Sequence, residues 1–199
     1  MIERCLAIQK ILEQVENEDL ALTTTGMVSR EAFVANDRPG NFYMLGSLGL
    51  LSSFGLGLAL LRPERWVFVL EGDGSALMSM GTLALIPTEA PRNLVHIILD
   101  NEAYESTGGQ PSISSAVDLA EVARSCGYPR VLKVHHLESL EEALAGCQPN
   151  SGPHLILVKA SIAPVKGIPR VSHSPIEIRD RFRASVRDVP QGIGYGPSS

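Results

Sequence analysis

The strongest local signal for a binding site is the segment Glu71-Gly72-Asp73-Gly74-Ser75. It follows a continuous apolar run of strand length and precedes a stretch with helical periodicity. In an open α/β sheet, ligands bind at the carboxyl ends of strands, where glycines let the backbone approach a phosphate and a helix start favours the anion. An aspartate there would repel a phosphate directly but can hold one through a divalent cation. Taken alone, the segment is more simply an Asp-Gly turn.

A second polar group favours the binding site over the turn. Asn101 ends the next apolar run, so two parallel strands would deliver Asp73 and Asn101 to the same edge of a sheet. A loop carbonyl just after Asn101 could supply a third oxygen. Mg²⁺ takes about six oxygens, and a diphosphate and one water would complete the set. The spacing therefore indicates a magnesium–diphosphate site.

A Gly-Asp-Gly segment followed by an asparagine at the end of the next strand resembles the fingerprint of thiamine-diphosphate enzymes. The resemblance implies that Asp73, Asn101 and the carbonyl of Ala103 hold Mg²⁺ on the diphosphate of that cofactor. One departure is Asp100, because family members often have a second asparagine at that place.

Longer segments narrow the resemblance. Residues 41–50 and 99–110 are similar to sulfopyruvate and phosphonopyruvate decarboxylases, residues 24–31 and Arg181-Phe182 fit the same group, and the similarity covers roughly residues 1–187. Leu48 stands where this group usually has the methionine that props the cofactor in its bent shape, and leucine is bulky enough for that task. The cofactor-binding residues that the resemblance implies are Thr25, Gly26, Gly46, Ser47, Leu48, Gly72, Asp73, Gly74, Ser75, Asn101, Ala103, Tyr104, Glu105, Ser106 and Thr107.

In this family a glutamate on another domain activates the cofactor, and 199 residues leave no room for that domain. The resemblance therefore implies the β subunit of a split decarboxylase with a pyrimidine-binding partner subunit. Its expected substrate is a small anionic 2-oxoacid, either 3-sulfopyruvate, giving sulfoacetaldehyde and CO₂, or 3-phosphonopyruvate, giving phosphonoacetaldehyde. An acetolactate-synthase-like carboligase subunit and a non-enzymatic α/β module for a phosphorylated ligand remain alternatives.

Along the chain, segments with the pattern of a strand alternate with segments that have the periodicity of a helix. The alternation predicts an α/β fold, a parallel sheet of about six strands with helices on both faces. We expect one domain over residues 1–187, a long loop over 100–115, a Pro-rich extended segment over 161–175 and a disordered tail over 188–199. The predicted strands are 20–24, 66–70, 94–99, 131–134 and 154–159, and the predicted helices are 2–16, 29–36 with a Ser29 cap, 47–61, 75–85, 117–126, 137–145 and 175–187.

Composition limits the other classes of function. The net charge of −5, with no long run of Lys or Arg, argues against a nucleic-acid partner. The uncharged stretch 44–61 is long enough for a membrane span, but its glycines and serines favour a tightly packed internal helix. Three scattered cysteines fit a reducing cytoplasm and are expected to be small buried apolar residues. His96 is predicted to be a core residue, whereas Glu71 either forms a salt bridge or merely ends its strand.

Overall fold

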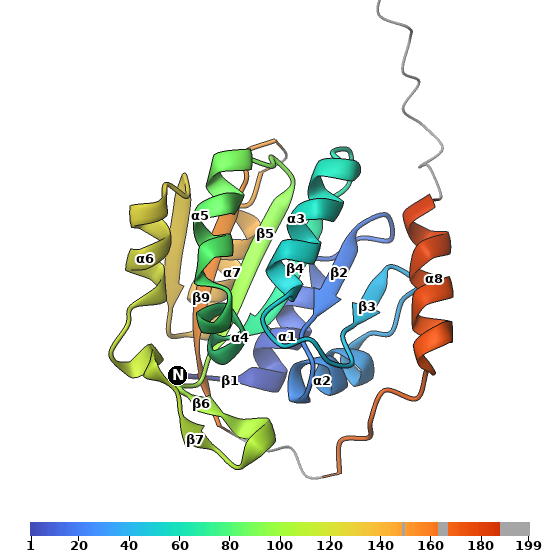
Figure 1. The fold of residues 1–199 in the computed structure, drawn as a ribbon, viewed down its shortest axis with the longest axis horizontal. Coiled ribbons are helices and arrows are strands. Elements are labelled where there is room, and N and C mark those ends of the chain that lie inside the picture. Colours follow the sequence, from blue (N-terminus) through green and yellow to red (C-terminus); the bar gives the residue numbers. More distant parts are fainter. Residues whose placement is uncertain (149, 163–166, 188–199) are drawn as a thin grey trace, which may run out of the picture.

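The computed structural model describes residues 1–148, 150–162 and 167–187. Within this part of the chain, seven strands form one parallel sheet in the order β1-β9-β5-β4-β2-β3, with β8 also pairing with β9 (Figure 1). The predicted parallel α/β fold is confirmed. The predicted tail, 188–199, and residues 163–166 of the predicted Pro-rich segment lie outside the described residues. The strands of the sheet are β1 (Ile2–Glu3), β2 (Leu20–Thr23), β3 (Asn41–Tyr43), β4 (Val67–Gly72), β5 (Leu94–Asp100), β8 (Arg130–Val134) and β9 (His154–Ser161).

Helices cover both faces of the sheet because alternate side chains of each strand point to opposite sides. In β4, Phe68 and Leu70 pack with α1 (Arg4–Glu13), α2 (Met27–Ala35) and α7 (Leu137–Ala145) in one core. Val67 and Val69 pack on the other side with α3 (Leu51–Leu61), α5 (Met80–Glu89) and α6 (Leu119–Cys126). The last helix, α8 (Pro175–Arg187), lies along the edge strand β3 (Figure 1).

The central strands are buried throughout, which explains their continuous apolar sequences. Every residue of β5 is buried, and so are five of the six residues of β4. Since β4 and β5 pair in parallel with Gly72 opposite Leu99, their carboxyl ends meet at one edge of the sheet. The segments that follow them are therefore held side by side.

Several predicted boundaries were wrong, each for a local reason. The helix predicted over 47–61 begins only at Leu51, because Ser47 and Gly49 have positive φ angles that break a helix. The helix predicted from Ser75 begins at Asp73 and is interrupted at Ser79, giving α4 (Asp73–Met78) and α5. Residues 2–3 and 41–43 form short edge strands that were not predicted from the sequence.

Ser29 does not cap α2, which begins two residues earlier, after Gly26. Its hydroxyl instead donates to the Thr24 carbonyl oxygen at 2.7 Å. The segment predicted as a loop over 100–115 contains a two-stranded hairpin, β6 (Ala103–Tyr104) with β7 (Gln110–Pro111), and two short 3₁₀ turns. The three cysteines are free and half-buried rather than fully buried. No helix in the described ranges has the length and apolar character needed to cross a bilayer.

Candidate cofactor-binding site

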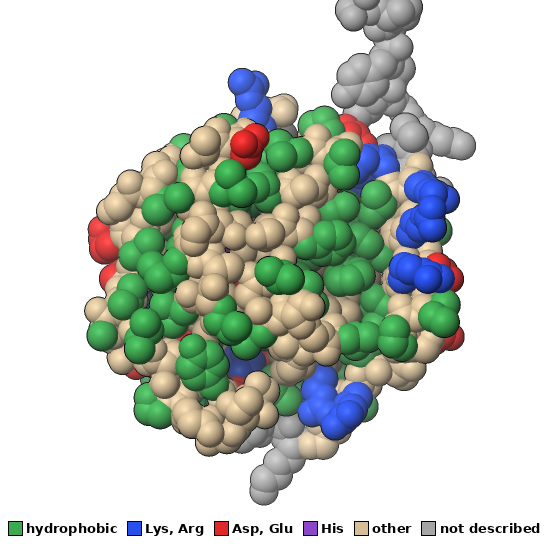
Figure 2. Space-filling model, viewed as in Figure 1, with side chains coloured by type: hydrophobic (Ala, Val, Ile, Leu, Met, Phe, Trp, Pro, Cys, Tyr) green, Lys and Arg blue, Asp and Glu red, His purple; other side chains and the backbone are tan. Residues whose placement is uncertain are grey.

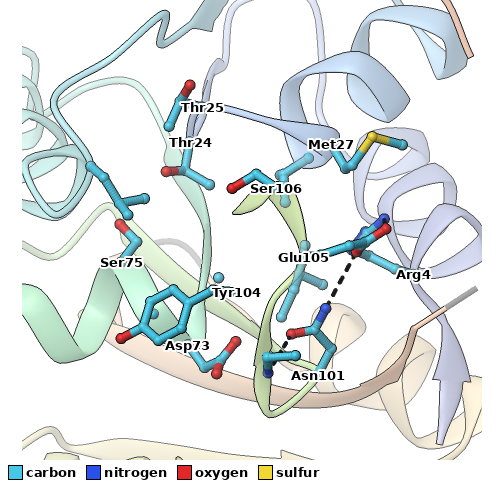
Figure 3. Close-up of a pocket in the computed structure, with 16 residues that line it drawn as sticks. Arg4, Thr24, Thr25, Met27, Asp73, Ser75, Asn101, Tyr104, Glu105 and Ser106 are labelled. Atoms are coloured by element: carbon cyan, nitrogen blue, oxygen red, sulfur yellow. Dashed lines mark hydrogen bonds and ion pairs between the residues drawn. The ribbon is translucent and has the colours of Figure 1, made fainter. Parts of the chain in front are cut away.

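One cavity opens at the carboxyl edge of the sheet, between the ends of β4 and β5 and the start of α2 (Figure 3). Most of the residues implicated from the sequence line it. Those residues are Thr25, Leu48, Gly72, Asp73, Gly74, Ser75, Asn101, Ala103, Tyr104, Glu105 and Ser106. The parallel pairing of β4 with β5 brings them together, since Asp73 and Asn101 each lie just beyond the paired residues Gly72 and Leu99.

Asp73 is a buried carboxylate at the first position of α4. Its Oδ2 atom accepts hydrogen bonds from the hydroxyls of Ser112 and Ser114, the latter at 3.1 Å. Burial raises the pKa of Asp73, and the charge of nearby Asp100 acts in the same direction. A buried carboxylate that lacks a cationic partner in the described structure is suited to a bound metal ion.

Asn101 and Ala103 form a tight turn after β5. Asn101 Oδ1 accepts the Ala103 N–H at 3.1 Å, and its Nδ2 donates to Glu105 at 3.4 Å. The turn is possible because Glu102 has a φ of +59°. A carboxylate, a carboxamide oxygen and a backbone carbonyl form an oxygen-only set that suits Mg²⁺. Across the described residues, no three His, Cys, Asp or Glu side chains gather as a metal cluster.

Gly74 has no room for a side chain. A Cβ atom at this position would overlap the ring of Tyr104, which packs directly over the backbone of α4. The glycine therefore leaves the peptide backbone bare between Asp73 and Ser75, where an anionic group can approach it closely. The residues present thus fit a metal-bound diphosphate.

The hydroxyl of Ser75 connects this edge of the sheet to the loop that carries Leu48. Ser75 Oγ donates to Glu71 Oε2 at 2.6 Å and accepts the Gly49 N–H at 3.2 Å. Gly49 has a φ of +93°, and a Cβ on it would lie 2.9 Å from Met78 Cβ. These contacts fix the loop against α4 and place Leu48 in the cavity wall.

Sequence reasoning missed Arg4, which also lines the cavity (Figure 3). Its guanidinium binds the buried Glu31 carboxylate, with Arg4 Nη2 2.6 Å from Glu31 Oε1, and it also pairs with Glu105. Burial alone would lower the pKa of Arg4, but the two carboxylates outweigh it and raise the pKa. No local pattern around Arg4 signals this role, because both partners are distant in sequence.

Four of the implied residues lie outside this cavity. Gly26 lines an adjoining cavity, whose wall also includes Thr25, Glu105 and Ser106. Gly46, Ser47 and Thr107 line neither cavity and are exposed. Their contact with a cofactor remains a prediction.

Comparisons with known proteins agree with this geometry. The family model "Thiamine pyrophosphate enzyme, C-terminal TPP binding domain" matches residues 24–158. A phosphonopyruvate decarboxylase from Streptomyces viridochromogenes is 42% identical over 95% of this chain and 47% of its own length. The β subunit of sulfopyruvate decarboxylase from Methanococcus maripaludis is 39% identical over 90% of this chain and 96% of its own length. The chain thus spans about half the length of the Streptomyces relatives that it matches.

A solved structure shares the fold. The thiamine-diphosphate-dependent 4-hydroxybenzoylformate decarboxylase of Rhodococcus jostii RHA1 superposes with a TM-score of 0.67 and 20% sequence identity, over 80% of this chain and 32% of that chain. The predicted family and its cofactor, thiamine diphosphate, are confirmed. The chain belongs to the thiamine pyrophosphate enzyme family and carries its C-terminal, thiamine-pyrophosphate-binding domain.

Proposed function

We propose that this chain is the diphosphate-binding subunit of a thiamine-diphosphate- and Mg²⁺-dependent decarboxylase of a small 2-oxoacid with an anionic head group. A second, pyrimidine-binding subunit completes the active site, and both act in the cytoplasm. Asp73, Asn101 and the Ala103 carbonyl hold the Mg²⁺. Leu48 packs against the cofactor, which when bound supplies the electron sink for loss of CO₂.

The observation that carries this proposal is that no free glutamate stands beside the cavity to activate the cofactor, among the residues that the structure describes. Both glutamates near the cavity that could activate the cofactor, Glu31 and Glu105, are ion-paired with Arg4. The activating carboxylate is therefore expected on another polypeptide.

Exposed apolar side chains beside the cavity support the proposal of a partner subunit. Large apolar side chains in segments next to the site are more than half exposed, as expected for an interaction surface. Figure 2 shows hydrophobic side chains spread over the face of the molecule that α3 and α5 cover. The exposed side chains nearest in sequence to the site are Leu45 and Leu50, each 55% exposed, Met78, 62% exposed, and Ile113, 61% exposed.

We favour 3-sulfopyruvate as the substrate, giving sulfoacetaldehyde and CO₂. The support is that relatives 35–39% identical over at least 90% of this chain are named as β subunits of sulfopyruvate decarboxylase. The 42% identity to the Streptomyces viridochromogenes phosphonopyruvate decarboxylase keeps 3-phosphonopyruvate, giving phosphonoacetaldehyde, as the second candidate.

The test is a decarboxylase assay of the purified chain with saturating thiamine diphosphate and Mg²⁺, with and without the candidate partner subunit encoded beside it. We expect CO₂ release only in the mixture. A positioned acid–base group is worth roughly 10²–10⁴-fold, so replacing the partner's activating glutamate by glutamine should lower turnover by that factor. Robust turnover by the chain alone would contradict the split site. A carbon–carbon coupled product from pyruvate would indicate a carboligase, and cofactor binding without any turnover would indicate a binding module.

A further inference from the structure

A second cavity adjoins the cofactor cavity and has a volume of about 670 Å³, within the usual range for small-molecule sites. Thr25, Met27, Glu105 and Ser106 line both cavities, so the two adjoin. The rest of the second wall comes from α2, the segment before Leu48, and the segment leading into α8. The residues it adds are Gly26, Ser29, Arg30, Met44, Leu45, Arg170, Val171, His173 and Pro175.

The charges that line this second cavity are mostly positive. Arg30 and Arg170 form no ion pair with any Asp or Glu side chain of the described ranges. Among the described residues of the wall the one carboxylate, Glu105, is already paired with Arg4. The cavity therefore presents two guanidinium groups that no carboxylate of the described ranges compensates, although the whole chain carries a net charge of −5.

The neighbouring basic side chains, in contrast, are paired with carboxylates. Arg4 is held by two carboxylates, and His173 lies 2.8 Å from Asp37. Asp37 also pairs with Arg181 at 3.0 Å, which ties α8 and the segment before it to the rest of the fold. Arg4, His173 and Arg181 thus each contact a carboxylate, whereas Arg30 and Arg170 contact none among the residues that the structure describes. Figure 2 shows basic side chains at the surface near α2 and along α8.

We propose that Arg30 and Arg170 form an anion subsite that holds the sulfonate or phosphonate head group of the oxoacid substrate. The inference rests on the proposed function and names the residues that select its substrate class. Guanidinium groups match the tetrahedral oxygens of both head groups through paired N–H donors. Because Ser106 lines both cavities, a head group beside it would leave the oxoacid end facing the cofactor cavity.

The chemistry of the reaction sets the kinetic signature of this subsite. The substrate carboxylate leaves as CO₂, but the head group keeps its charge from substrate to product. Binding it therefore stabilises the ground state and the transition state equally, which lowers KM without changing kcat. An arginine that acted on the reacting atoms would instead change kcat.

The test compares Arg30→Gln, Arg170→Gln and the double variant with wild type, all as holoenzyme with the partner subunit. Arg92→Gln is the matched control, because Arg92 is exposed and precedes β5 at the opposite edge of the sheet. Charged hydrogen bonds are worth enough for KM of sulfopyruvate or phosphonopyruvate to rise roughly 10- to 100-fold in each single variant. We expect kcat to stay within about twofold, and KM for pyruvate, which lacks the head group, to stay unchanged. Both oxoacids are assayed, and KM should rise more for phosphonopyruvate, because its head group carries more charge than a sulfonate.

A binding measurement separates this inference from the proposed function. Calorimetry with sulfoacetate and phosphonoacetate, which keep the head group but cannot be decarboxylated by this route, should show binding to wild type and Arg92→Gln. The double variant should lose it. If wild type decarboxylates the oxoacids but the arginine variants keep wild-type KM and analogue affinity, the subsite is wrong and the proposed function stands. If no oxoacid is decarboxylated, the function is wrong, and analogue binding by wild type but not by the double variant still supports the subsite.

Discussion

Nε2 of His96 lies 2.7 Å from Oε1 of Glu71, and both side chains are almost completely buried. His96 Nδ1 lies 3.1 Å from the Tyr128 hydroxyl. Burial and the Glu71 charge raise the pKa of Tyr128, so its phenol stays neutral and can donate to His96. Glu71 therefore does more than end its strand. It connects the core of the sheet to Ser75 and, through Ser75, to the loop of Leu48.

Glu71→Gln should destabilise the fold and loosen the Leu48 loop together. The carboxamide keeps the shape of the side chain but cannot accept from both Ser75 and His96. A hydrogen bond to a charged group contributes about 1.5–3 kcal/mol, so loss of one of these two hydrogen bonds should lower the free energy of unfolding by about that amount. Chemical denaturation measures the loss, with exposed Glu138→Gln as control. Unchanged stability would mean that the hydrogen-bond chain has no structural role.

Asp73→Asn should remove Mg²⁺-dependent cofactor retention and yet stabilise the free chain at neutral pH. Burial raises the pKa of Asp73 above its ordinary 3.8, so the fold favours the protonated form. The stability linked to this group is present below pH 3.8 and is lost as pH rises through the folded-state pKa. The gain from asparagine should therefore be full at pH 7 and shrink toward pH 4. Thermal melts between pH 4 and 7 test the stability, and calorimetry with thiamine diphosphate and Mg²⁺ tests retention. Wild-type cofactor affinity in Asp73→Asn and in Asn101→Ala would exclude both as metal ligands.

Leu48→Ala should lower turnover of the complex more than it weakens cofactor binding, because it removes shape rather than charge. Leu48→Met is the matched control and should retain activity. It introduces the methionine expected at this position from the resemblance to sulfopyruvate and phosphonopyruvate decarboxylases. Steady-state kinetics and cofactor titration separate the two effects. A holo structure with Leu48 farther than ~4.5 Å from every cofactor atom would exclude direct packing.

The segment 102–115 should gain order when cofactor and Mg²⁺ bind. Its base is already anchored, since Ser114 Oγ donates to Asp100 at 2.7 Å and Glu105 pairs with Arg4. Residues 106–110, at its tip, are exposed. Hydrogen exchange should therefore slow at the tip, with little change at the base or in β9. Equal exchange at the tip in apo and holo complexes would argue against a cofactor-ordered loop.

Sequence reasoning succeeded where local pattern and tertiary position coincide. The apolar runs of β4 and β5 mark central strands, so the order of the residues alone was enough to place Asp73 and Asn101, which follow these strands, at one edge of the sheet. Sequence patterns could not predict contacts between residues that only the folded chain brings together. Arg4 and Glu105 are 101 residues apart, and β1 has only two residues and thus no periodicity. The small and apolar residues after residue 46 are typical of a helix, and the sequence gives no sign of the positive φ of Ser47.

The position of β1 also determines where any polypeptide joined ahead of Met1 would emerge. Ile2 and Glu3 pair with Ala160 and Ser161, at the carboxyl end of β9, so the amino terminus lies at the same edge of the sheet as the cofactor cavity (Figure 1). A tether at Met1 would deliver a fused domain beside the mouth of the cavity without crossing the sheet. The same placement makes the amino terminus a sensitive position for an affinity tag, since Arg4 lies only three residues beyond it and lines the site.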